Sequence, residues 1–230
     1  MIAFRRYDFD CRRLLSYVLA LGVLTTLATP GADYADSSGD MVECANLIYS
    51  GTKSSVCFSE EFLSTVAAET SISTSRKFKP VKLGEAEVFR FPFAVMTGEG
   101  AFTLTDSERK NLKTYLEKGG FLLASAGCSS QEWGDSFTRE IATIFPERKL
   151  ADVPMDHPIF RTVFDILRLE TKQEDAKLSG LTIGGKIVLI YSPDGLNDTT
   201  TMHGCCCCGG NEIKDSQKVN ANILAYALLQ

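Results

Sequence analysis

Four consecutive cysteines, Cys205 to Cys208, are the most reactive feature of this 230-residue chain. They lie in the stretch TMHGCCCCGGNE, residues 201–212, between a His-Gly and a Gly-Gly pair. Neither a helix nor a strand turns four neighbouring side chains toward one core, so the run is expected in a loop. There it would bind a metal, form disulfides or present a reactive thiol.

A metal site is one of these alternatives. Cys205 and Cys208 form a C-x-x-C pair, the spacing with which two thiolates hold one tetrahedral metal. Sulfur ligands favour zinc or another soft metal. A complete four-cysteine zinc site usually has two separated pairs, whereas this chain has one compact run. The further ligands are expected among Cys57, Cys128, His203, Cys206 and Cys207.

Disulfide pairing is the second alternative. Of the eight cysteines, Cys11 precedes the apolar segment described below, and seven remain. Seven is odd, so disulfides within one chain cannot use them all. Cys205 to Cys208 could pair with Cys57 and Cys128 and fasten the loop to the sheet. A thiol redox protein built on Cys205 and Cys208 is a third reading, but a redox C-x-x-C normally starts a helix, and no helix start is evident there.

A catalytic reading centres on Cys128, which directly follows an apolar strand. A nucleophilic thiol needs a nearby base. The chain has two histidines, His157 and His203. His157 precedes a proline, where a hydrogen bond from its side chain to the backbone is expected, and His203 lies in the cysteine-rich loop. Glu99 and Asp194 would otherwise act as an acid pair or bind a hard cation. The sequence leaves open whether the protein is an enzyme.

The N-terminus predicts export. A basic segment is followed by the uncharged apolar run 14–28 and then by proline, small residues and acids. This order is typical of a secretory signal peptide, predicted over 1–35, and the run is short for a membrane-spanning helix. The alternative is an uncleaved anchor in the inner membrane, which would be the only contact with a membrane. Either way, the domain 36–230 is predicted to be periplasmic or secreted.

The rest of the chain predicts one α/β domain with a mostly parallel sheet and helices on both faces. Strands are expected over 42–51, 91–96 and 121–127, and a hairpin over 181–192 with its turn at Gly184-Gly185. Helices are expected over 59–71, 105–118, 134–147 and 219–230, the second with a capping box of Thr105 and Glu108. The net charge of −5 argues against a nucleic-acid partner, so a small molecule or a protein is expected.

Ligands of open parallel sheets bind beyond the carboxyl ends of the strands. Those ends are small, polar or glycine-rich in this sequence. Cys128, Cys57 and the cysteine run are expected at the same rim, while Cys44, at the start of its strand, is expected away from it. The predicted ligand-binding residues are Tyr49, Thr97, Gly98, Glu99, Gly100, Ser192 and Asp194.

Three long stretches resemble a known bacterial family. FPFAVMTGEGAFTLTDSERKNLKTYLEKGGFLLAS, FTREIATIFPERKLADVPMDHPIF and IVLIYSPDGL are similar to the "domain of unknown function 4159" family, from about Val42 to the C-terminus. The resemblance implies a flavodoxin-like fold of the class I glutamine-amidotransferase-like superfamily and brings no established activity. The cysteine run looks like the mark of a Cys-rich subgroup. Together these features favour a binding module with a Cys-rich metal or disulfide site; the alternative is an amidotransferase-like hydrolase or transferase that uses Cys128 or the loop carboxylates.

Overall fold

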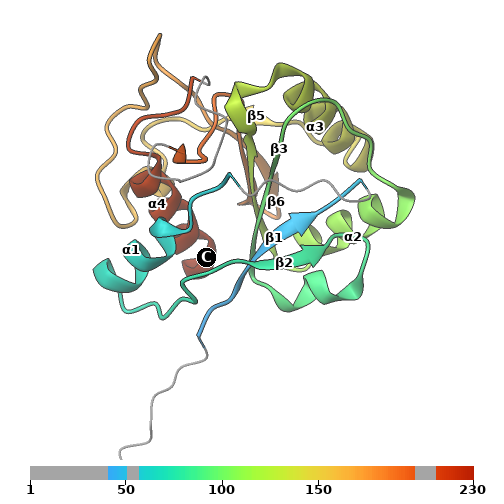
Figure 1. Cartoon of the computed structure of the whole chain (residues 1–230), viewed down its shortest axis with the longest axis horizontal. Coiled ribbons are helices and arrows are strands. Elements are labelled where there is room, and N and C mark those ends of the chain that lie inside the picture. The colour runs from blue at the N-terminus through green and yellow to red at the C-terminus, as the bar shows by residue number, and fades with distance from the viewer. Residues whose placement is uncertain (1–40, 51–56, 200–210) are drawn as a thin grey trace, which may run out of the picture. The chain divides into compact units, whose positions relative to one another are not determined.

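A seven-stranded sheet forms the centre of the domain (Figure 1). The computed structural model describes residues 41–50, 57–199 and 211–230. The strands are β1 (Cys44–Ile48), β2 (Lys79–Lys82), β3 (Phe93–Gly98), β4 (Phe121–Ala126), β5 (Ala151–Asp152), β6 (Ser179–Ile183) and β7 (Lys186–Ser192). The helices are α1 (Glu61–Glu69), α2 (Asp106–Glu117), α3 (Gln131–Ile144) and α4 (Ser216–Leu229), with short 3₁₀ turns η1 (Ala86–Arg90), η2 (Gly127–Ser129) and η3 (Pro158–Arg161).

The strand order is β2-β1-β3-β4-β7-β6-β5. The first five strands run parallel, and β6 and β5 add an antiparallel edge. The predicted mostly parallel α/β fold is therefore confirmed, and its arrangement is consistent with a flavodoxin-like fold. The predicted hairpin is also confirmed as β6 and β7. Gly184 and Gly185 have φ of +59° and +82° at its turn, a region that favours glycine.

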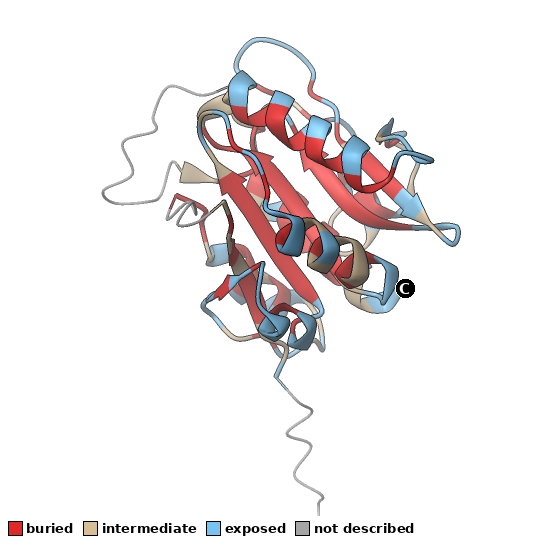
Figure 2. Cartoon of the chain, turned by 90° about the vertical axis from the view of Figure 1, so that its right-hand side faces the viewer, coloured by how far each residue is buried: buried red, intermediate tan, exposed pale blue. Residues whose placement is uncertain are grey.

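Helices cover both faces of the sheet. Successive residues of a strand point to opposite faces, so β3 contributes Phe93 and Val95 to one core and Ala94 and Met96 to the other. The first core lies under α1 and α4, and the second lies under α2 and α3. Figure 2 shows buried strands between helices whose outer sides are exposed. The unit Ser38–Gln230 is one compact body, and no helix in its described part is long and apolar enough to cross a membrane.

Helix starts follow the side chains that cap them. The predicted capping box of α2 is confirmed: Thr105 Oγ1 accepts a hydrogen bond from Glu108 N, and Glu108 Oε2 accepts one from Thr105 N. Helix α3 begins at Gln131, three residues before the predicted start, because Ser130 accepts a hydrogen bond from the Trp133 amide and serves as its N-cap. Helix α1 begins two residues after the predicted start at Ser59, and its N-cap is Glu60.

Strand β2 was missed by the sequence reasoning. Its sequence, KPVK, has one apolar side chain, Val81, and a proline, which lacks a backbone donor. The strand lies at the sheet edge and pairs only with β1 among the described strands. An edge strand needs hydrogen bonds on one side alone, so proline and lysines are tolerated there.

Replacement of Phe121 by alanine tests the core under α1 and α4. The Phe121 ring is 1% exposed and stacks on Phe93 with ring centroids 5.7 Å apart. Phe121→Ala is expected to lower the free energy of unfolding by about 3–5 kcal/mol, through lost burial and the cavity left behind. Phe89→Ala is the matched control, because Phe89 is 43% exposed, and it is expected to cost less than about 1 kcal/mol. Urea denaturation measures both; equal losses would contradict this account of the core.

Candidate functional site

The carboxyl ends of β3, β4 and β7 meet at one edge of the sheet. We call the partly or fully exposed residues there the carboxyl-edge rim: Glu99, Gly100, Cys128, Ser129, Asp194 and Asn211. Hydrogen bonds join the loops that carry them. Ser129 Oγ donates to the Asp194 carbonyl at 2.6 Å and accepts from Asn211 N at 2.7 Å. The Gly100 amide donates to Ser130 Oγ at 3.1 Å.

A buried network beneath the rim holds these loops in place. Asn197, 1% exposed, lies at its centre. Its Nδ2 donates to the Cys57 carbonyl at 2.8 Å and to Thr97 Oγ1 at 3.0 Å, and its Oδ1 accepts from Ser125 Oγ. Ser125 Oγ also accepts from the Leu196 amide at 2.7 Å. The side chain of Asn197 therefore ties the loop after β7 to β3, to β4 and to the segment before α1.

Sequence reasoning did not identify Asn197 or Ser125 as site residues. Both are ordinary polar residues in sequence, one inside an apolar strand and one in a loop. The available signal was Ser125 within FLLASAG, because a hydroxyl in a fully buried strand must find a hydrogen-bond partner. The identity of that partner, 72 positions away, depends on the strand order.

Three of the predicted ligand-binding residues are buried and support the rim instead of contributing to its surface. Tyr49, Thr97 and Ser192 are 0%, 0% and 0% exposed. Tyr49 OH donates to the Thr97 carbonyl at 3.0 Å and accepts from Trp133 Nε1 at 2.6 Å, and burial raises the pKa of Tyr49 to about 12. A side chain at Gly98 would place its Cβ 2.3 Å from Tyr49 Oη, so glycine is required for this approach. Ser192 Oγ accepts from the Gly195 amide at 3.1 Å.

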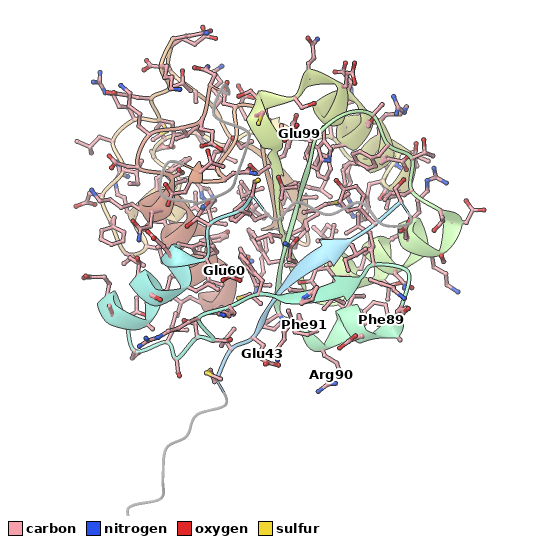
Figure 3. The ribbon with its side chains drawn as sticks, in the orientation of Figure 1. Glu43, Glu60, Phe89, Arg90, Phe91 and Glu99 are labelled. Atoms are coloured by element: carbon pink, nitrogen blue, oxygen red, sulfur yellow. The ribbon has the colours of Figure 1, made fainter. Side chains whose placement is uncertain are left out.

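Cys128 and Glu99 lie side by side on the rim. Cys128 Sγ donates to Glu99 Oε1 at 3.4 Å, across the ends of β4 and β3. Figure 3 shows Glu99 at this end of the sheet. The backbone of Cys128 is left-handed, with φ 50° and ψ 29°, and Ser129 follows with φ 53°. The strand therefore turns sharply here before Ser130 starts α3, which directs Cys128 to the surface rather than into the core.

Carboxylates on the loop after β7 are destabilised in their charged form. Burial, and then the charge of Glu174, raises the pKa of Asp194, while a hydrogen bond from Asn211 opposes the shift. Burial is also the main reason why the pKa of Asp198 is raised, followed by the charges of Glu61 and Glu212. Within the described part of the chain, Asn211 Oδ1 and Glu212 Oε1 are buried without a hydrogen-bond partner.

The other predicted cysteines and histidines are dispersed. Cys57 is 8% exposed and lies next to the rim through its carbonyl. Cys44 is buried in β1, where burial raises its pKa to about 12, away from the rim as predicted. His157 Nδ1 accepts from the Ile159 amide at 3.2 Å, which is the predicted hydrogen bond to the backbone. Its ring lies 5.4 Å from that of Tyr226 in the last turns of α4.

The predicted metal site falls outside what the structure describes. Cys205, Cys206, Cys207, Cys208 and His203 all lie in the undescribed segment 200–210. Among the described residues, no group of three or more Cys, His, Asp or Glu is arranged to hold a metal. A zinc or other soft-metal site that uses the cysteine run therefore stays a prediction.

A comparison with protein families gives a match that spans most of the chain. The model described as "Domain of unknown function (DUF4159)" matches residues 44–228. The chain belongs to this family. A comparison with curated proteins found no significant match. The DUF4159 match covers every strand of the sheet and all four helices except Leu229, the last residue of α4, so the rim is part of the family domain.

Removal of the Asn197 side chain tests the network of this DUF4159 domain. Asn197→Ala leaves the Cys57 carbonyl and the Thr97 and Ser125 hydroxyls without their partner. It is expected to lower the free energy of unfolding by at least about 3 kcal/mol, since each buried polar group left unpaired costs about 1–3 kcal/mol. Asn111→Ala is the control, because Asn111 is half-buried and bonds the Leu83 carbonyl near the surface. Similar losses in urea denaturation would refute the central role of Asn197.

Because the pKa of Asp194 is raised, the Asp194→Asn substitution is expected to increase the stability of the domain by an amount that depends on pH. The native state holds the proton more tightly than the unfolded state does, so native stability falls as pH rises from the ordinary value of 3.8 through the raised pKa. At pH 7 the partly buried charge of Asp194 destabilises the native state, and asparagine carries no such charge. The variant should therefore unfold at a higher temperature than the wild type. The gain should shrink toward zero below the ordinary pKa. Asp165→Asn, at an exposed position, controls for net charge; a gain that is independent of pH would contradict the assignment.

Proposed function

We propose that this domain is a non-catalytic binding module of an exported protein. Its ligand, a small molecule or a segment of another protein, contacts the carboxyl-edge rim. The cysteine run 205–208 is fastened beside that rim by a disulfide to Cys57. The state of Cys57 is the observation that carries the proposal.

Cys57 supports a disulfide rather than a metal or a reactive thiol. Among the described cysteines, Cys44 and Cys128 carry thiols and Cys57 does not, which supports a disulfide at the Cys57 sulfur. Cys11 precedes the apolar run 14–28, so whether or not the leader is cleaved an exported domain offers only Cys205 to Cys208 as partners for Cys57. The Cys57 carbonyl also accepts a hydrogen bond from Asn197, so a disulfide at this position would attach the cysteine run to the buried network beneath the rim. An exported location would favour such a bond.

The surroundings of Cys128 argue against a catalytic thiol. A nucleophilic cysteine needs a base or a positive charge close to its sulfur. Among the described residues, Cys128 Sγ donates to the Glu99 carboxylate, which brings no positive charge to the sulfur. His157, the one histidine in the described residues, lies near Tyr226, which in turn contacts Phe121 at the opposite end of β4.

An amidotransferase-like activity of Cys128 is the second candidate. It is favoured by the left-handed backbone of Cys128 at a sharp turn from strand to helix, which exposes the sulfur. The two candidates differ in thiol reactivity. We expect iodoacetamide to alkylate Cys128 no faster than it alkylates glutathione at pH 7. Alkylation at least tenfold faster, read by peptide mass spectrometry, would support the catalytic candidate.

The disulfide is tested on the protein purified from an exported compartment, unfolded in iodoacetamide without reductant. Mass spectrometry is expected to find Cys44 and Cys128 alkylated and Cys57 linked to a peptide that contains Cys205 to Cys208. Reductant should lower the free energy of unfolding of the wild type by about 2–4 kcal/mol and leave a Cys57→Ser variant unchanged. Cys44→Ala, which removes a thiol, is the control and should keep the response to reductant.

Elemental analysis of the same sample distinguishes the metal alternative. The proposal predicts no stoichiometric metal. A metal site would instead give one zinc ion per chain in the wild type and none in a Cys205→Ser/Cys208→Ser variant. Cys57 of the wild type would then be alkylated only after chelation. These results together would replace the disulfide with a metal site. Alkylation of Cys57 without either treatment would refute both.

A further inference from the structure

The opposite edge of the sheet, where the strands begin, exposes apolar side chains. We call it the amino edge. Of the four large hydrophobic side chains that the described residues expose, three lie there: Met41 at 55%, Phe89 at 43% and Leu229 at 71%. Met41 precedes β1, Phe89 precedes β3, and Leu229 ends α4 beside Gln230, which bonds the Ile187 carbonyl at the start of β7. Exposed apolar groups gathered at one edge mark an interaction surface.

A pocket opens on the amino edge between the starts of β3 and β4. It has a volume of about 520 Å³ and is lined by Phe89, Arg90, Phe91, Pro92, Thr114, Tyr115 and Lys118, together with Gly119 and Gly120. Figure 3 shows Phe89, Arg90 and Phe91 together with Glu43 at this end, opposite Glu99. The carboxyl-edge rim and this pocket therefore lie at opposite ends of the same strands.

The charged side chains that line the pocket are all positive. Its lining contains Arg90 and Lys118 and no acid. Both cations are exposed, and neither forms an ion pair with any described residue. The acid Glu43 is neutralised by Lys79 at 3.4 Å, and Glu87 lies outside the lining. Cations beside an exposed aromatic ring match the surface of an anionic bilayer, where phosphates are followed by an apolar layer.

An uncleaved N-terminal anchor would bring this edge close to a membrane. The domain begins at Met41 on the amino edge, and only residues 29–40 separate it from the apolar run 14–28. Twelve residues reach at most about 40 Å. We propose that the amino edge is a membrane-docking surface that binds anionic phospholipid through Arg90, Lys118 and Phe89. This orientation rests on the proposed export with an uncleaved anchor and leaves the carboxyl-edge rim facing away from the bilayer.

Vesicle sedimentation tests this surface without the leader, on residues 36–230, which contain the whole compact unit. The vesicles contain phosphatidylcholine with about one third phosphatidylglycerol. We expect the domain to sediment with these vesicles and not with pure phosphatidylcholine. Arg90→Ala/Lys118→Ala should weaken binding about 30-fold, since each cation lost near an anionic surface costs about fivefold. Phe89→Ala should weaken it as well while the domain stays folded.

Lys110→Ala/Lys172→Ala is the matched control. These lysines are exposed, form no ion pair with a described residue and do not line the pocket. The control variant should bind like the wild type. Equal weakening of both double variants would mean a general charge effect and would overturn the proposal, as would a wild-type domain that does not bind anionic vesicles. These outcomes are independent of Cys57, so the disulfide proposal and the docking proposal can fail separately.

Discussion

The carboxyl-edge rim depends on one buried amide, that of Asn197. An amide in a core carries donors and an acceptor that water cannot reach, so each must find a protein partner or cost free energy. In this domain the partners come from β3, β4 and the segment before α1. The hydrogen bonds that pair the Asn197 amide therefore also fix the positions of these three chain segments relative to one another. Loops that start from fixed points present Glu99, Cys128 and Asp194 in a defined arrangement.

The two ends of the sheet differ in their physical character. At the carboxyl end, polar side chains and sharp turns cover the strands, and exposed groups are carboxylates, a thiol and amides. At the amino end, aromatic and aliphatic side chains are exposed near Arg90 and Lys118, which form no ion pair with a described residue. Because parallel strands share one direction, the loops that follow the strands lie at one end of the sheet and the loops that precede them lie at the other. The proposed membrane docking would use one end of the sheet for attachment and leave the other end for a ligand.

The sequence predicted the elements whose signal is local. Apolar runs gave β3, β4 and β7, and the Thr105–Glu108 box gave α2, because strand burial and helix capping act within a few residues. Strand β2 has no such signal, since an edge strand beside β1 needs only one ladder of hydrogen bonds. The start of α3 was placed late because Ser130 becomes a cap only after the left-handed turn at Cys128 and Ser129.

By itself the sequence determined the fold class, the gathering of strand ends into one rim, and the position of Cys128 and Glu99 on it. These follow from hydrophobic periodicity and from the geometry of any parallel sheet. Only the tertiary structure decided that Tyr49, Thr97 and Ser192 are buried supports, that Asn197 joins the loops, and that Cys128 donates a hydrogen bond to the Glu99 carboxylate. Those facts depend on contacts between residues far apart in the chain, and the strand order that creates them is not written in any single segment.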